Sequence, residues 1–376
     1  MGWCHGTGAP PHPPPAPQVG LSATQPASVP LFDEVGGWPA ILHQLTSGQD
    51  LSADHAAAAM AEVFAGRATP AQTAAFIVAL RMKGETIEEI TGLSQAMAAA
   101  AERVVVPDDL QDRLVDTCGT GGDRSGSINV STMAALVVAG CGVPVVKHGN
   151  RAASSACGTA DVLEALGVRI DLGADGVLHC LLDAGMGFCF AQRFHPAMRH
   201  AGPVRRELGV PTVFNFLGPL TNPSGARRQM LGISDGSMAS RMAGVLAARG
   251  SLSAIVVHGH GGLDEASTTG PSEALRVFAD GHIEPMTIDP AALGLASATA
   301  ADLAGGDAAT NAEVVRVVLG GATGPHRDIV LLNAAAALVV ADVADSVETG
   351  LGLAAASVDD GAAASVLDRL ITASNA

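Results

Sequence analysis

The chain has 376 residues, of which 48% are hydrophobic and 45 are glycine, a composition that suits a packed α/β protein of more than one domain rather than a disordered chain. The formal net charge is −16, from 21 Lys and Arg against 37 Asp and Glu, which argues against broad binding to nucleic acid. No apolar run approaches the roughly 20 residues of a membrane span, and the six cysteines show no paired or zinc-type spacing. We therefore expect a soluble, cytoplasmic protein.

The N-terminal part of the chain divides into a proline-rich tail and a helical region. Residues 1–30 hold eight of the 21 prolines and predict a disordered tail. Helix-start signals then open three segments, at about 52–65, 69–82 and 86–102. Since no strand pattern separates these segments, we expect a small α-helical domain over residues 31–106.

A glycine-rich turn behind a short strand gives the first sign of a binding site. Strand-compatible residues at 114–117 lead into three glycines within residues 119–122. The apolar run that follows predicts a helix over 133–138, with Ser131 or Thr132 as its N-cap. A strand, a glycine turn and a helix start let backbone N–H groups face a phosphate without Cβ atoms in the way. The pattern favours an anion site, although many glycine clusters are only tight turns.

A second junction of strand and loop follows further along the chain. Residues 143–146 predict a strand, and the loop after it, 147–155, is rich in cations, amides and hydroxyls. The carboxyl ends of parallel strands meet at one edge of a sheet, so we expect the two loops to lie side by side and to cradle a polyphosphate. Lys147 is one of only two lysines in the chain, which favours a phosphate contact over a solvated charge at the end of a strand.

Strands and helices alternate after the two junctions. The expected elements are a helix at 159–166, a strand at 187–191, a helix at 239–248 and a strand at 254–258. This alternation predicts an α/β fold with a mostly parallel central sheet in a large domain over residues 107–376. The alternation of strands and helices is interrupted at 196–223, and we expect this segment of the chain to lie with the helical domain. The last third predicts packing helices at 331–343 and 362–372.

Two adjacent acids, Asp264 and Glu265, follow the last of these strands on a glycine-rich loop. Carboxylates on a loop can converge on one site, and their oxygens suit Mg²⁺. Such a pair is usually only solvated, but a neighbouring phosphate cradle favours the metal role because polyphosphate chemistry uses a divalent cation. His258 and His260 lack the further ligands that a zinc site requires.

An arginine in the returning stretch is a candidate for a second substrate. The planar guanidinium of Arg205 could pair with a carboxylate through two parallel hydrogen bonds. The alternative is a surface salt bridge with Glu207, two residues further on.

Six ordered motifs resemble those of the anthranilate phosphoribosyltransferases of tryptophan biosynthesis. They are GTGGD at 119–123, NVST at 129–132, KHGNRAASS at 147–155, GTADVLEALG at 158–167, FNFLGPLTNP at 214–223 and GLDE at 262–265. The resemblance implies a small α-helical domain plus a large α/β domain of the nucleoside phosphorylase and phosphoribosyltransferase type, usually in a homodimer. It also implies a reaction in which 5-phosphoribosyl 1-pyrophosphate and anthranilate give N-(5-phosphoribosyl)anthranilate and pyrophosphate, with Mg²⁺.

The resemblance also assigns residues to the ligands. Contacts to the phosphoribosyl donor are implied for Gly119, Gly122, Asp123, Ser127, Asn129, Val130, Ser131, Thr132, Lys147, His148, Gly149, Asn150, Arg151, Ala152, Ala153, Ser154, Ser155 and Thr159. Contacts to anthranilate are implied for Gly119, Asn150 and Arg205, and to magnesium for Ser131, Asp264 and Glu265. The chain departs from the common family pattern at Ser127 and Thr159, where each change keeps a hydroxyl, and at Pro211, where arginine is common.

Two other functions remain open at this stage. A pyrimidine nucleoside phosphorylase shares the architecture, but it would not need the pair of acids for magnesium. A binding protein that kept the fold but binds nucleic acid is disfavoured by the net charge of −16. Within the favoured reaction we expect no protein nucleophile and no general base, because an aromatic amine is already neutral at pH 7 and needs positioning more than deprotonation.

Overall fold

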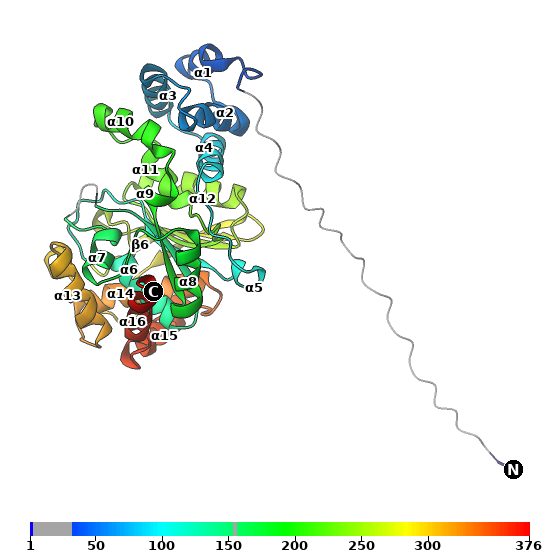
Figure 1. Cartoon of the computed structure of the whole chain (residues 1–376). Coiled ribbons are helices and arrows are strands. Elements are labelled where there is room, and N and C mark those ends of the chain that lie inside the picture. The colour runs from blue at the N-terminus through cyan, green and yellow to red at the C-terminus, as the bar shows by residue number, and fades with distance from the viewer. Residues whose placement is uncertain (3–31, 153–155) are drawn as a thin grey trace.

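A computed structural model describes residues 1–2, 32–152 and 156–376 of the chain. Apart from Met1 and Gly2, the tail predicted at 1–30 lies outside the described residues, and so do Ala153, Ser154 and Ser155 of the second loop. The described chain forms a layer of helices at one end and a larger body around a central sheet at the other (Figure 1). Within these residues no helix is both long and apolar enough to span a bilayer.

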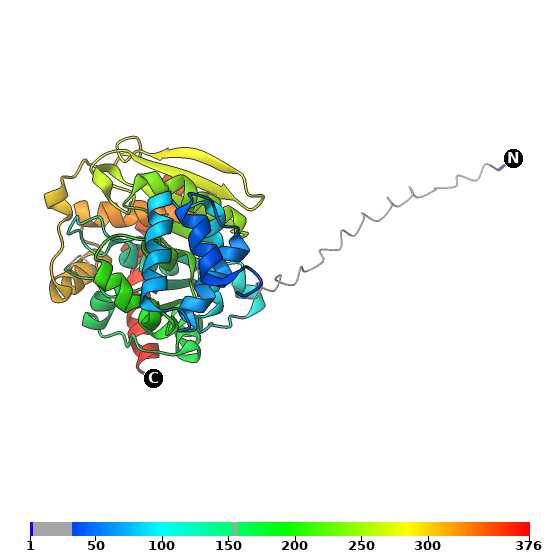
Figure 2. The ribbon, with the colours of Figure 1, turned by 90° about the horizontal axis from the view of Figure 1, so that it is seen from above.

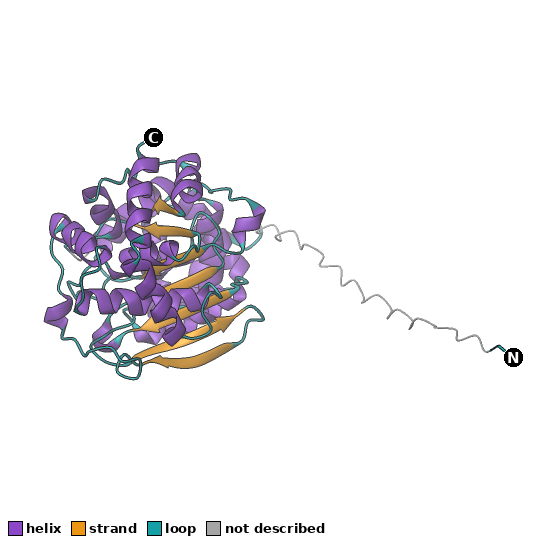
Figure 3. Cartoon of the chain, turned by 90° about the horizontal axis from the view of Figure 1, so that it is seen from below, coloured by secondary structure: helices purple, strands orange, loops and turns teal. Residues whose placement is uncertain are grey.

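The central sheet has seven strands in the order β3-β2-β1-β4-β5-β6-β7 (Figure 3). The strands are β1 (Val115–Gly119), β2 (Val145–Gly149), β3 (Met186–Phe190), β4 (Arg228–Gly232), β5 (Ser253–His258), β6 (Ser272–Phe278) and β7 (Ile283–Ile288). The first five pair in parallel, whereas β6 and β7 form an antiparallel extension at one edge. The predicted α/β class with a mostly parallel sheet is confirmed.

Helices cover both faces of the sheet. They are α5 (Asp108–Gln111), α6 (Val130–Gly140), α7 (Thr159–Ala165), α8 (Ala174–Ala184), α9 (Ala191–Phe194), α12 (Ala239–Ala248), α13 (Ala308–Leu319), α14 (Pro325–Val340), α15 (Val347–Asp359) and α16 (Ala362–Ser374). Successive strand residues face opposite layers, as the two-residue period of a strand requires. In β5, Ile255 and Val257 pack in the core that includes α6 and α14, whereas Ala254 and Val256 pack in the core that includes α12.

The helical layer combines the N-terminal helices with a later segment. It consists of α1 (Gly37–Thr46), α2 (Ala53–Phe64), α3 (Pro70–Lys83), α4 (Ile87–Ala99), α10 (Met198–Leu208) and α11 (Phe214–Leu217). Figure 2 views the molecule from the side of this layer. Ala201, Val204 and Phe214 of the later segment share one apolar core with Ile77 and Leu80 of α3. Contacts with α12 join this layer to the sheet.

The caps read from the sequence explain where the first helices begin. Ser52 accepts a hydrogen bond from the first turn of α2, and Thr69 and Thr86 form capping boxes with Gln72 and Glu89. The cap expected for the helix after the glycine turn was wrong. This helix, α6, begins at Val130 behind Asn129, so that Ser131 and Thr132 lie inside its first turn, where their hydroxyls bond to neighbouring segments.

Candidate active site

The glycine turn and the acidic loop meet at the carboxyl edge of the sheet. Gly119 ends β1, and a Cβ at this position would lie 2.1 Å from Oδ2 of Asp264. Gly121 and Gly122 follow with φ of 66° and 83°, a conformation that favours glycine. The N–H of Gly121 donates to Oδ2 of Asp264 over 2.7 Å. Segments far apart in the sequence therefore converge here, as predicted.

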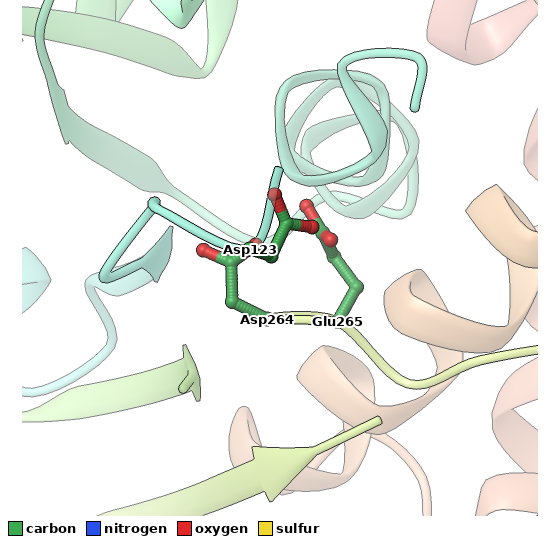
Figure 4. A group of neighbouring side chains, drawn as sticks. All are labelled: Asp123, Asp264 and Glu265. Atoms are coloured by element: carbon green, nitrogen blue, oxygen red, sulfur yellow. The ribbon is translucent and has the colours of Figure 1, made fainter. Parts of the chain in front are cut away.

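Three carboxylates form a cluster at this junction (Figure 4). One oxygen from each of Asp123, Asp264 and Glu265 lies within 4.8 Å of the others. The two residues of the loop after β5 were expected to hold magnesium. Asp123 was assigned to the donor alone, and the bend at the two left-handed glycines returns its side chain to the acids.

Burial and mutual repulsion make this cluster electrostatically unfavourable without a cation. Burial, with the charge of Asp123 next, raises the pKa of Asp264 to about 6. Burial and the charge of Asp264 raise the pKa of Glu265 well above its ordinary value. Oε2 of Glu265 is buried and has no hydrogen-bond partner in the described chain. Three carboxylates with an unpaired buried oxygen are a donor set that fits Mg²⁺, which prefers oxygen ligands.

Lys147 is buried inside the site rather than solvated. Only 1% of its surface is exposed, and its Nζ donates to the carbonyl of Thr117 and, over 3.1 Å, to Oγ of Ser131. Burial lowers the pKa of Lys147, and the charge of Asp116 opposes this effect. The alternative of a solvated charge at the end of the strand was wrong. Lys147 joins β2 to β1 and to the start of α6, and Ser131 also lines the narrow cavity beside Glu265.

Hydrogen bonds tie the start of α6 to the segments around it. Asn129 donates to the carbonyl of Cys157 over 3.2 Å and accepts from Asn311 over 2.8 Å. Within α6, Val130 is buried, and Thr132 bonds to Thr159 at the start of α7 over 3.3 Å. These contacts place the first turn of α6 beside the glycine turn. Val130 and Thr132 donate their N–H groups to the carbonyls of Ile128 and Asn129, whereas the N–H of Ser131 has no partner within the described residues.

Polar side chains support the loops on either side. Oγ of Ser127 accepts from Ser125 over 3.0 Å, and its backbone pairs with Ala304. In the second loop, Oδ1 of Asn150 accepts from the N–H of Arg151 over 2.8 Å and from Gln192 over 3.4 Å. The exposed side chain of Asn150 is thus held in place from two sides.

The guanidinium of Arg151 is turned towards α7. It forms ion pairs with Asp161 and Glu164, each at 2.9 Å, and lies over the ring of Phe190 at 5.7 Å. The N–H of Ala152 donates to Asp161 over 2.9 Å. In this arrangement Arg151 orders the loop through α7 rather than presenting a free charge.

Arg205 lies on α10 and packs on the following segment. Its guanidinium stands 5.0 Å above the ring of Phe214, and burial lowers its pKa. No ion pair joins Arg205 to Glu207, although both residues are described, so the surface salt bridge considered from the sequence is not formed. Among the residues that the structure describes, Arg205 forms no ion pair with a carboxylate.

Two buried histidines pack against each other beside the second loop, a pairing that the sequence did not indicate. The rings of His148 and His195 lie 5.0 Å apart, and Nδ1 of His148 is 3.1 Å from the carbonyl of Gly218. Burial lowers the pKa of His148 to about 3 and that of His195 to about 4, so both are neutral. Gly149 packs against Thr159 on the other side of this loop. The resemblance implies that His148 contacts the donor. The contact between His148 and His195 could not be predicted from the sequence, because it depends on the pairing of β2 with β3.

Comparison with known proteins agrees with this fold. Residues 39–101 match the helical bundle domain of a glycosyl transferase family, and residues 111–364 match its α/β domain. The fold and site thus define a glycosyl transferase with a helical bundle and an α/β domain.

Relatives within this class narrow the assignment. The chain is 55% identical to the anthranilate phosphoribosyltransferase of Salinispora arenicola, over 90% of this chain and 97% of the relative. The crystal structure of the enzyme from Thermus thermophilus is 40% identical, with a TM-score of 0.84 over 89% of this chain and 99% of that one. The enzyme from Saccharomyces cerevisiae in complex with PRPP (5-phosphoribosyl 1-pyrophosphate) and Mg is 27% identical, with a TM-score of 0.81 over 90% of this chain and 98% of that one. The chain belongs to the anthranilate phosphoribosyltransferase family.

Proposed function

We propose that the glycine turn, the start of α6 and the carboxylate cluster form the active site in which this chain catalyses the reaction of its family. That reaction transfers the 5-phosphoribosyl group from 5-phosphoribosyl 1-pyrophosphate to the amine of anthranilate. The observation that supports this site most directly is the convergence of Asp123, Asp264 and Glu265 beside the N–H groups of the glycine turn. An anionic diphosphate with a divalent cation suits such a junction of backbone donors and acids.

The donor would bind across the turn and the start of α6. Within the described residues, the N–H of Gly122 in the left-handed turn and that of Ser131 in the first turn of α6 form no hydrogen bond, so both can donate to phosphate oxygens. Lys147 adds a fixed positive charge beneath them through its contact with Ser131. These groups are ordered before the substrate arrives, so little reorganisation is needed as charge develops on the departing pyrophosphate.

The residues that would hold Mg²⁺ are Asp264 and Glu265, with Asp123 and Ser131 beside them. When bound, the ion neutralises negative charge on the pyrophosphate as the bond to the ribose breaks. Mg is present with PRPP in the yeast relative, which supports this role.

The acceptor would lie between the second loop and α10. Asn150 offers an amide held by Gln192, and Arg205 offers a guanidinium without an acidic partner for the carboxylate of anthranilate. The neutral aromatic amine attacks the ribose carbon directly, and positioning rather than deprotonation sets its reactivity. The neutral pair of His148 and His195 adds no positive charge near the acceptor at pH 7.

We also propose a homodimer in the cytoplasm. Met82 of α3 is 83% exposed, which places a large apolar side chain on the outer surface of the helical layer. Cys118, Cys141, Cys180 and Cys189 form no disulfide bond, which suits a reducing compartment. Light scattering would measure the mass of the assembly, and Met82→Glu should weaken a dimer formed through this layer.

The activity is tested by mixing the protein with the donor, Mg²⁺ and anthranilate and following the loss of anthranilate fluorescence. Arg205→Ala should raise the KM for anthranilate by about 30- to 150-fold, because one charge-assisted contact is worth roughly 2–3 kcal/mol. The KM for the donor should change much less. Arg206→Ala, next to it on the exposed surface, is the matched control. Equal effects on both substrates would contradict the assignment of Arg205 to the acceptor.

A further inference from the structure

A cavity of about 360 Å³ lies behind the linker between the helical layer and the sheet. One wall comes from the end of α4 and the residues after it, Ala98, Ala99 and Ala101. The loop at 221–225, which ends the returning segment, forms a second wall, and Arg249, just after α12, closes a third side. Helices α4 and α12, which end at this cavity, pack against each other (Figure 1). The lining shares no residue with the carboxylate cluster of the active site.

Two arginines line this cavity, Arg103 and Arg249, and neither forms an ion pair with an acid in the described part of the chain. Arg103 is exposed in the linker, and Arg249 is half-buried, donating from one guanidinium nitrogen to the carbonyl of Leu220. Burial lowers the pKa of Arg249, which reflects a cation held away from water without a compensating charge. In a protein with 37 acidic and 21 basic residues, two unpaired arginines on one cavity are unexpected. The adjacent acid, Glu102, forms its ion pair with Arg193 of α9 rather than with either arginine of the cavity.

A purely structural role explains these arginines less well. Arginines near helix ends often cap the last carbonyls of the helix. In the last turn of α4, however, the carbonyls of Ala96 and Ala98 already accept from Ala100 and Ala101. Arg249 bonds outside its own helix, to the carbonyl of Leu220, and its other guanidinium nitrogens form no hydrogen bond within the described residues. Guanidinium N–H groups of Arg249 are therefore available to donate to a ligand in the cavity.

We propose that this cavity binds a small organic anion, whose carboxylate or phosphate group pairs with Arg103 and Arg249. The alanines at the end of α4, together with Pro223, give the cavity an apolar wall for the rest of such a ligand. Arginine suits this role because its planar fork forms parallel hydrogen bonds with either kind of oxyanion. The site goes beyond the proposed reaction, for which the donor and acceptor have their own places.

The linker connects this cavity to the loop that we assign to anthranilate, so an anion bound in the cavity would affect acceptor binding. Glu102, one residue before Arg103, forms ion pairs with Arg193, and its N–H donates to the carbonyl of Phe194. Gln192, in the same short helix α9, donates to Asn150. An anion that fixes the linker at Arg103 would therefore restrain α9 and, through it, the loop that we assign to anthranilate.

Calorimetric titration of the full chain with inorganic phosphate, and separately with 3-phenylpropionate, tests the site. Saturating 5-phosphoribosyl 1-pyrophosphate and Mg²⁺ are present so that phosphate does not report on the donor site. At least one probe should bind the wild type, and Arg103→Gln and Arg249→Gln should each weaken that binding at least about tenfold. Arg316→Gln, on the exposed surface of α13, is the matched control and should bind as the wild type does.

The two probes separate the possible ligands. Binding of phosphate alone indicates a phosphorylated ligand, and binding of 3-phenylpropionate alone indicates a carboxylate. Arg103→Gln changes an exposed side chain, so it tests the site even if Arg249→Gln unfolds the protein. The inference is overturned if neither probe binds at up to about 10 mM, or if wild type and Arg103→Gln bind equally. The proposed reaction is measured separately by anthranilate fluorescence and would stand in either case.

Discussion

Replacing Glu265 with glutamine should stabilise the metal-free protein and abolish its response to Mg²⁺. The side chain keeps its shape, but one of three carboxylates within 4.8 Å of one another loses its charge. At an effective dielectric constant of about 20, two unit charges at this separation repel each other by about 3 kcal/mol. Partial protonation of the wild-type cluster already relieves much of this repulsion, since the pKa of Glu265 is raised. We expect a net gain of about 2 kcal/mol in the free energy of unfolding without metal.

Thermal unfolding with and without Mg²⁺ measures both effects. The wild type should unfold at a higher temperature when Mg²⁺ is added, because a ligand that binds only the folded state stabilises it. Glu265→Gln should unfold a few degrees higher than the wild type in EDTA, and Mg²⁺ should add little. Turnover should fall at least about 100-fold, since one oxygen ligand of the ion is lost.

The matched control is Glu273→Gln, an exposed residue of β6 that lies outside the cluster. It should leave the stability, the response to Mg²⁺ and the turnover unchanged. The reasoning would be refuted if Glu265→Gln lowered the stability in EDTA while Mg²⁺ still stabilised the variant as it does the wild type. In that case Glu265 would be an ordinary packing residue and the acids would not form a metal site.

Two further predictions follow from the packing around the site. Gly119→Ala should lower kcat/KM at least about 100-fold, because its Cβ would lie 2.1 Å from Asp264, whereas Gly352→Ala, at an open and exposed position of α15, should retain full activity. The neutral pair of His148 and His195 should make the protein less stable as the pH falls. Their folded pKa values of about 3 and about 4 lie below the ordinary 6.5, so the unfolded chain binds more protons between pH 6.5 and 4. The raised pKa values of Asp264 and Glu265 act in the opposite direction, so urea unfolding at pH 7 and pH 5 is compared between the wild type and His195→Gln. On going from pH 7 to pH 5 the wild type should lose about 1 kcal/mol per pH unit more than the variant, and an equal pH dependence of the two proteins would contradict neutral burial.

Local signals in the sequence determined much of the fold. The caps at Ser52, Thr69 and Thr86 depend on residues three positions away, so they can be read without tertiary structure. The alternation of strands and helices likewise gave the class, because parallel strands need crossover helices. The glycine turn and the adjacent acids Asp264 and Glu265 were recognisable because their residue types are adjacent along the chain.

Only the tertiary structure decided which side chains share a space. Asp123 became part of the carboxylate cluster because left-handed glycines reverse the chain before it, which residue types alone do not specify. Lys147 was read as facing a phosphate, yet its Nζ is buried against Thr117 and Ser131 because β2 lies next to β1. The cavity at Arg103 and Arg249 joins residues from the linker and from the end of α12, and no local pattern relates them. Spacing along the chain records neighbours in sequence, whereas strand order and packing determine the neighbours in space.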